Sequence, residues 1–298
     1  MQTVSIIGVG RIGGALALAL DSKGYAIENL ILRDERKAEI IREKLKAESQ
    51  IFTVAEAEKI TSDIVFICTQ HTEIGNVAEI LAGKLRHQPF VFHTSGALSS
   101  EILNELKNIG CRVGSIHPLV SVSDPTVGVE RFRAAYFCVE GEIEAIAIAE
   151  KIVADLNGNS FSIETEYKIL YHAAAVNACG HLIALLGASF EMLGKCGLDD
   201  ENGKQILLPL IKSTIENLET QTPAEALTGT FARADAETFE RHLETMGKNV
   251  SPEILEIYLL LGLRSLPLAE KQGANPENIN KIQNKIQKRL LLAKKNFK

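Results

Sequence analysis

The stretch VSIIGVGRIGGALALAL, residues 4–20, decides the fold of the first half of this chain. Its β-branched start, Val4–Gly8, suits a buried parallel strand, and the alanines and leucines at its end suit a helix. Between them Gly8, Gly10 and Gly13 stand in the spacing G-x-G-x-x-G. After a strand and before a helix, such glycines permit a tight turn, a close approach of pyrophosphate to the backbone, and close packing of helix on strand. The stretch therefore predicts a dinucleotide-binding loop.

The whole loop is expected to contact the cofactor, because the N-terminus of the following helix would face the pyrophosphate. The loop residues concerned are Gly8, Val9, Gly10, Arg11, Ile12 and Gly13.

The choice of cofactor is expected at the end of the second strand, Leu30–Arg33. A carboxylate there binds the ribose 2′-hydroxyl and favours NAD, whereas an arginine accommodates a 2′-phosphate. Arg33 stands about where that side chain belongs, and Arg36 and Lys37 follow closely. NADP(H) is therefore favoured, while Asp34, next to Arg33, keeps NAD(H) open.

Further buried strands alternate with helical stretches through the first half of the chain. Alternation of this kind predicts an α/β domain with a doubly wound, mostly parallel sheet. The expected strands are Asp63–Thr69, Phe90–Ser95, Arg112–Pro118, Ala134–Glu140 and a short edge segment near 160–163, with helices at about 35–48 and 142–156.

Polar residues gather where three of these strands end. Ligands of such sheets lie beyond the carboxyl ends of the strands, so these residues are expected to share one cleft. Ordinary capping of loops is the alternative for each of them taken alone. On the cleft interpretation Thr69, Gln70 and Thr94 would contact the cofactor, and Ser95, Gly96 and His117 would line the substrate side.

From Thr165 onward the pattern becomes helical, with no alternation typical of strands. The expected helices span about 165–194, 200–220, 236–247, 251–271 and 276–296. The sequence therefore predicts two domains without a flexible linker: a nucleotide-binding domain over 1–164, and an all-α substrate domain over 165–298, whose first long helix would lie beside the cofactor cleft.

The first helix of the second half begins KILYHAAAVNACG, residues 168–180. Lys168 and His172 lie about 40° apart on an α-helix and therefore point the same way. Transfer of a hydride to or from a carbon needs a proton moved at the neighbouring heteroatom, and a lysine–histidine pair beside the cleft could move it. The alternative is a close helix contact with a satisfied ion pair at its rim.

A later stretch, Ala226–His242, offers further polar candidates. Thr228 lies in a polar turn, and Arg233 could bind a carboxylate or phosphate of the substrate through two hydrogen bonds. The alternative is a surface pair of Arg233 with Asp235, in which Asp235 is an N-cap.

Composition excludes several other classes of protein. The chain of 298 residues has a net charge of −6, which gives nucleic acid no general attraction. Its five cysteines show no C-x-x-C pairing, so we expect reduced thiols, no metal site and a cytoplasmic location. The apolar start lacks a basic region and contains Arg11, unlike a signal peptide, and we expect no other stretch to be long enough to span a bilayer.

Several segments together resemble one family. They are HTSGAL (93–98), GSIHPLVS (114–121), YKILYHAAAV (167–176), ILLPL (206–210) and ALTGTFARADAETFERH (226–242). In this order the chain resembles Rossmann-like proteins that carry a C-terminal domain of unknown function 2520, over essentially its whole length. The resemblance implies an NADP-dependent oxidoreductase related to pyrroline-5-carboxylate reductase, ketopantoate reductase, prephenate dehydrogenase and 6-phosphogluconate dehydrogenase. It also implies a homodimer, and it places Lys168 and His172 where that wider class has its catalytic pair.

The chain departs from this family pattern at four positions, Asn177, Gly180, Thr230 and Ala234. Our leading hypothesis is an enzyme that transfers a hydride between NADP(H) and a small polar, anionic keto, hydroxy or imino acid. The first alternative is a non-catalytic sensor or scaffold that binds NADP(H). A structural dimer, paired through the alanine-rich helix face, is the second.

Overall fold

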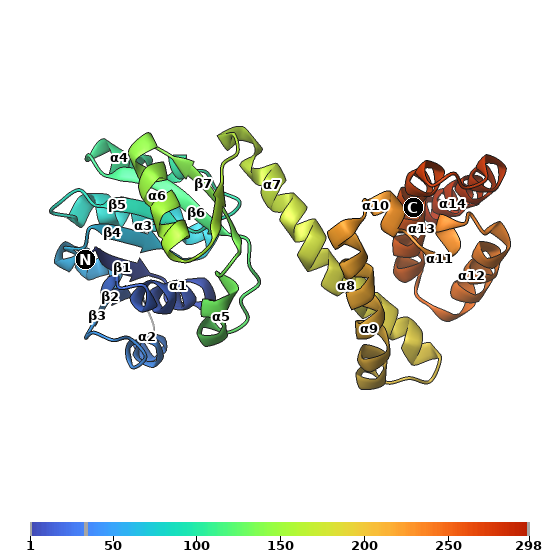
Figure 1. The fold of residues 1–298 in the computed structure, drawn as a ribbon, viewed down its shortest axis with the longest axis horizontal. Coiled ribbons are helices and arrows are strands. Elements are labelled where there is room, and N and C mark those ends of the chain that lie inside the picture. The colour runs from blue at the N-terminus through green and yellow to red at the C-terminus, as the bar shows by residue number, and fades with distance from the viewer. Residues whose placement is uncertain (1, 33–34, 297–298) are drawn as a thin grey trace. The chain divides into compact units, whose positions relative to one another are not determined.

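The computed structural model describes residues 2–32 and 35–296. The chain forms two compact units, Met1–Ala178 and Cys179–Lys298. The first unit is built around a sheet, and the second consists of helices (Figure 1).

The first unit contains one eight-stranded sheet with the strand order β3-β2-β1-β4-β5-β6-β7-β8. Neighbouring strands pair in parallel except β6 and β7, which are antiparallel. The predicted doubly wound, mostly parallel sheet is thereby confirmed. Its strands are β1 (Thr3–Ile7), β2 (Ala26–Ile31), β3 (Gln50–Phe52), β4 (Ile64–Ile67), β5 (Phe90–His93), β6 (Arg112–Pro118), β7 (Tyr136–Gly141) and β8 (Asn159–Phe161).

Helices cover both faces of this sheet (Figure 1). Successive residues of a strand therefore enter two different cores: Ile6 and Phe66 belong to one cluster, and Ile7 and Val65 to the other. Burial on both faces explains why the strands are continuous apolar runs. The helices are α1 (Arg11–Ser22), α2 (Glu35–Arg42), α3 (His71–Lys84), α4 (Asn104–Asn108), α5 (Pro125–Arg131), α6 (Ile143–Asp155) and α7 (Lys168–Ala175).

Four elements of the first unit, β3 and the helices α3, α4 and α5, are absent from the sequence prediction. Strand β3 has only three residues, of which Gln50 is exposed, so it carries no run long enough to indicate a strand. Helix α3 begins shortly after β4 and mixes apolar residues with four glycine or alanine positions, Gly75, Ala78, Ala82 and Gly83, which blur its apolar stripe.

The second unit is all-α, as predicted. Its core gathers apolar residues from several helices, including Phe239, Leu259 and Ile282. The last helix is amphipathic: Ile282 is fully buried, whereas Lys281 and Lys285 form surface ion pairs. The helices are α8 (His181–Lys195), α9 (Asp200–Thr220), α10 (Pro223–Ala226), α11 (Gly229–Ala232), α12 (Ala236–Asn249), α13 (Pro252–Lys271) and α14 (Pro276–Asn296).

The division between the units falls inside a continuous helical run. Helix α7 passes through a π-helical turn, Val176–Gly180, into α8. The first compact unit thus includes α7, which the sequence assigns to the second domain, because the side chain of Lys168 is buried against the sheet. A domain boundary at 164/165 stays a prediction.

The same helical run, Thr165–Lys195, has the length and apolar composition of a membrane span, with a mean hydropathy of 1.6 over its most apolar window. None of that window is buried within the chain. The expectation that no stretch meets this criterion is therefore wrong, because no aspartate, glutamate, lysine or arginine stands between Lys168 and Glu191. Length and composition alone do not place this helix in a membrane.

Candidate functional site

The loop between β1 and α1 has the geometry that its glycines predict. Gly8 has a φ of +91°, and a Cβ there would lie 2.8 Å from the backbone of Cys68 and Thr69. A Cβ on Gly13 would lie 2.1 Å from the carbonyl oxygen of Gly8. Gly10, by contrast, borders open space, with nothing within 4 Å of its Cβ position. No side chain caps the N-terminus of α1, so its N–H groups are available to an anion.

A cavity of about 620 Å³ adjoins this loop. It brings together most of the residues that the sequence places at the strand ends, and its size is that of a ligand site. Thr69 Oγ1 is buried there without a hydrogen-bond partner in the part of the chain that is described, which favours a ligand that bonds to it. The lining residues are Arg11, Ile12, Cys68, Thr69, Gln70, His71, Thr72, Thr94, Ser95, Gly96, His117, Pro118, Val120 and His172.

Other candidate residues lie elsewhere. The Val9 side chain packs in the apolar core, so only its backbone belongs to the loop surface. Arg33 and Asp34 lie outside the described residues, so the choice between NADP(H) and NAD(H) stays a prediction. Thr228 and Arg233 belong to the second unit, and their contact with substrate also stays a prediction. There Asp235 is the N-cap of α12 and accepts from the N–H of Thr238 at 3.0 Å, which is the capping role in the alternative interpretation.

Three imidazoles meet at the cavity. The His172 ring, on α7, lies edge to face with two others, at centroid distances of 5.8 Å from His71 and 6.0 Å from His117. Gly96 makes this approach possible, since a Cβ there would lie 2.6 Å from the rings of both His117 and His172. The sequence prediction includes His117 and His172 but not His71, which directly follows Gln70 at the start of α3.

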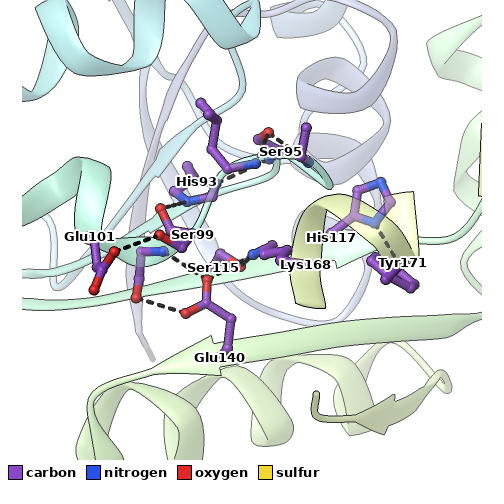
Figure 2. Close-up of polar contacts among 12 residues, drawn as sticks. His93, Ser95, Ser99, Glu101, Ser115, His117, Glu140, Lys168 and Tyr171 are labelled. Carbon is purple, nitrogen blue, oxygen red and sulfur yellow. Dashed lines mark hydrogen bonds and ion pairs between the residues drawn. The ribbon is translucent and has the colours of Figure 1, made fainter. Parts of the chain in front are cut away.

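Two of these rings form hydrogen bonds with hydroxyl groups. His71 Nδ1 lies 2.7 Å from Ser95 Oγ, and His117 Nδ1 lies 2.8 Å from Tyr171 Oη (Figure 2 shows the second contact). Burial, with the nearby His172 and Lys168, lowers the pKa of His117 to about 4. Burial and His71 also lower the pKa of His172. The His117 ring is therefore neutral at physiological pH.

Lys168 does not line the cavity. Its side chain is only 1% exposed, and its ammonium lies 2.7 Å from Glu140 Oε1 and contacts Ser115 Oγ (Figure 2). Burial lowers the pKa of Lys168, although Glu140 opposes this effect. Burial would raise the pKa of Glu140, but Lys168 and Ser100 outweigh it and hold that pKa below its usual value. For Lys168 the arrangement is the satisfied ion pair of the alternative interpretation.

Sequence reasoning misses several of these partners. His71 could have been found, because it continues the polar residues after β4. Tyr171 precedes His172 on the same helix, but nothing in its pattern indicates a contact with β6. Glu140 lies on β7, whose antiparallel pairing with β6 is not indicated by the alternation of strands and helices. Over residues 2–32 and 35–296 no cluster of three or more histidine, cysteine or acidic residues is placed to hold a metal ion.

Solved structures with the same fold come from several organisms. The chain matches the crystal structure of a "putative NADP oxidoreductase" from Bacteroides fragilis with a TM-score of 0.72 and 22% identity, over 89% of this chain and 97% of that one. It matches protein TM1727 from Thermotoga maritima with a TM-score of 0.70 and 24% identity, over 90% and 99%. A reductive aminase from Aspergillus terreus, in complex with NADPH and ethyl levulinate, has a TM-score of 0.58 and 14% identity, over 97% and 94%. These likenesses show the fold.

No curated protein matches the chain. Two family models do: a Rossmann-like domain over residues 1–118, and the domain of unknown function 2520 over residues 135–265. The second match crosses from the last strands of the sheet into the helices of the second unit. The chain thus joins a Rossmann-like domain to the domain of unknown function 2520.

Proposed function

We propose that this protein is an NADP(H)-dependent oxidoreductase that acts on a small polar, anionic keto, hydroxy or imino acid. One observation carries the proposal: a single cavity extends from Arg11 and Ile12, at the N-terminus of α1, to the imidazoles of His117 and His172. The candidate cofactor site and the groups that can transfer a proton thus line the same cavity. The names of structurally similar proteins, an NADP oxidoreductase and an NADPH-bound reductive aminase among them, support the same class.

The cofactor would be held by the first part of this cavity. The open side of Gly10 leaves room for a pyrophosphate against the backbone, and the uncapped N–H groups of α1 would bond to its oxygens. Arg11 adds a positive charge at the mouth, and the unpartnered Thr69 hydroxyl offers a further hydrogen bond. When bound, the nicotinamide cofactor would supply or accept the hydride.

The substrate would lie on the histidine side of the cavity. His172 has no hydrogen bond to another described residue and contacts the rings of His71 and His117, so it can take up and release a proton at the heteroatom beside the reacting carbon. Its lowered pKa keeps His172 mostly unprotonated near pH 7. An unprotonated His172 can accept a proton from the substrate during oxidation, and the protonated form can donate one during reduction.

Lys168 then has a different role from the one that the sequence favours. Its ammonium bonds to Glu140 and Ser115, and Lys168 is not among the residues that line the cavity. We assign it to positioning: it anchors the start of α7 on the sheet and so fixes where His172 stands.

The rival proposal is a sensor that binds NADP(H) without turnover. The two are separated by screening NADPH oxidation with a panel of small keto and imino acids, in the wild type and in His172→Asn. The enzyme proposal predicts turnover in the wild type and a loss of about 10²–10⁴-fold in kcat in the variant, with NADPH affinity unchanged. Tight NADPH binding without turnover on any member of the panel would favour the sensor.

A further inference from the structure

The hydroxyl groups of Ser95 and Tyr171 contact two of the cavity's imidazoles and indicate which chemical group the cavity binds. This inference rests on the proposed function, because it concerns the substrate side of the same cavity. The sequence analysis does not predict that either hydroxyl orients a histidine. It expects Ser95 to contact the substrate and gives Tyr171 no role.

Ser95 is 4% exposed, and its oxygen already accepts two hydrogen bonds, from the backbone N–H of Ala97 at 3.2 Å and of Leu98 at 3.1 Å. A serine hydroxyl has two acceptor positions and one donor hydrogen. With both acceptor positions used, its hydrogen is directed to Nδ1 of His71, at 2.7 Å. A neutral His71 must therefore carry its own proton on Nε2.

Tyr171 fixes His117 in the same way. A neutral imidazole has one nitrogen that donates and one that accepts, and the partner of one nitrogen determines which. A phenol is a better donor than acceptor, so the Tyr171 hydroxyl donates to Nδ1 of His117 across 2.8 Å. The proton of His117 then lies on Nε2, the ring atom beside Gly96 at the cavity wall.

We infer that Ser95 and Tyr171 are positioning residues that hold His71 and His117 as Nε2–H donors, so that the cavity binds an oxygen acceptor, the carboxylate of the substrate. Two fixed N–H donors suit a carboxylate with two oxygens and offer nothing to an ammonium group. His172 remains the ring that is free to exchange a proton. In this arrangement His71 and His117 bind the carboxylate, and His172 transfers the proton.

The tautomers can be measured directly by long-range ¹H–¹⁵N NMR of the imidazole groups in the free protein at about pH 8.5, well above the usual range of imidazole protonation. The expected spectrum shows His71 and His117 with a protonated Nε2 and an unprotonated Nδ1. In Tyr171→Phe, His117 should shift toward a mixture of both tautomers while His71 stays unchanged. Tyr136→Phe, at an exposed tyrosine of β7, is the matched control and should alter neither ring. A protonated Nδ1 on His117 in the wild type would overturn the inference.

The ligand class is tested with pyruvate and acetone, which share a carbonyl group and differ in the carboxylate. With the protein saturated in NADP⁺, pyruvate should move the Nε2–H resonances of His71 and His117, and acetone should not. Tyr171→Phe should weaken pyruvate binding about tenfold. Equal shifts with both probes, or none with pyruvate, would overturn the carboxylate assignment. Failure of NADP(H) to bind would contradict the proposed function. The tautomer measurement needs no cofactor, so it would still test the roles of Ser95 and Tyr171.

Discussion

Gly96 is the residue on which the packing of the three imidazoles depends. A methyl group at this position would come within 2.6 Å of the rings of His117 and His172. Both rings would have to move, and displacement of a catalytic group by about 1 Å can cost about 10²-fold in rate. Gly96→Ala is therefore expected to lower kcat/KM by about that factor.

The matched control for Gly96→Ala is Gly83→Ala, on α3, where the added methyl group meets nothing within 4 Å. It should leave kcat/KM unchanged and stabilise the helix slightly. Steady-state kinetics of the two variants decide the matter. Unchanged kinetics in Gly96→Ala would show that the imidazoles do not act in the arrangement described.

His93 gives the protein a predicted dependence of stability on pH. The ring is fully buried, accepts from the N–H of Ser95 and bonds to the carbonyl of Ser99, and burial with Lys168 lowers its pKa to about 4. Between that value and the usual pKa of about 6.5, the unfolded chain binds more protons than the folded one. The free energy of unfolding therefore rises with pH through this window. Above the window His93 makes its full contribution to stability.

His93 alone accounts for about 3 kcal/mol across that window, and His117 adds in the same direction. Urea unfolding at pH 7, 6 and 5 tests this, above the range in which carboxylates titrate. The urea midpoint should fall steadily from pH 7 to pH 5. A midpoint that stays constant or rises toward pH 5 would mean that these rings are protonated in the folded state.

At the scale of elements, the buried pair Lys168–Glu140 attaches α7 to β7. Removal of one partner leaves the other charge buried and unpaired, which typically costs about 3–5 kcal/mol. Lys168→Met should lower the free energy of unfolding by about this amount, measured by urea denaturation. In Lys168→Met/Glu140→Met part of the loss should return, although Ser100 then lacks its carboxylate partner.

Lys151→Met is the control for this pair, because Lys151 and Asp155 form an exposed ion pair at 2.6 Å. Pairs of that kind contribute less than about 1 kcal/mol. If Lys168→Met were as stable as this control and lost only turnover, Lys168 would act as an acid or base and not as an anchor.

The elements also show which parts of the structure the sequence can predict. The long apolar strands and the glycine loop are local patterns, so β1, β4, β5 and the long helices of the second unit follow from periodicity and spacing. The pairing of β7 with β6 and the short β3 depend on contacts distant in sequence. For the same reason the strand-end rule finds Thr69, Ser95 and His117 but not the partners of Lys168 and His117, which come from other elements.

At the scale of the whole molecule we propose a homodimer. Helices α8 and α9 leave large apolar side chains in solvent, with Ile183 70% and Leu210 62% exposed. Large apolar patches on a protein surface often mark interaction sites. A second copy of the chain would cover these side chains without any further partner.

Light scattering should therefore give a mass of about 65 kDa, twice the 32.5 kDa of the chain. Ile183→Glu should reduce it to that of a single chain, whereas Ile143→Glu, at an exposed position on α6, should not. A monomeric wild type at micromolar concentration would contradict the proposal, and binding of the wild type to lipid vesicles would assign the apolar helix to a membrane surface instead.

The most direct test of the proposed function is a titration with NADPH and NADH, followed by the fluorescence of the reduced cofactor. The chain has no tryptophan to interfere. We expect saturable binding, tighter for NADPH than for NADH. Gly10→Ala, which adds a methyl group where only open space is present, should weaken binding at least about tenfold, whereas Gly83→Ala should not. If neither cofactor binds the wild type, or if Gly10→Ala binds as well as the wild type, the loop is not a dinucleotide site and the proposed function is wrong.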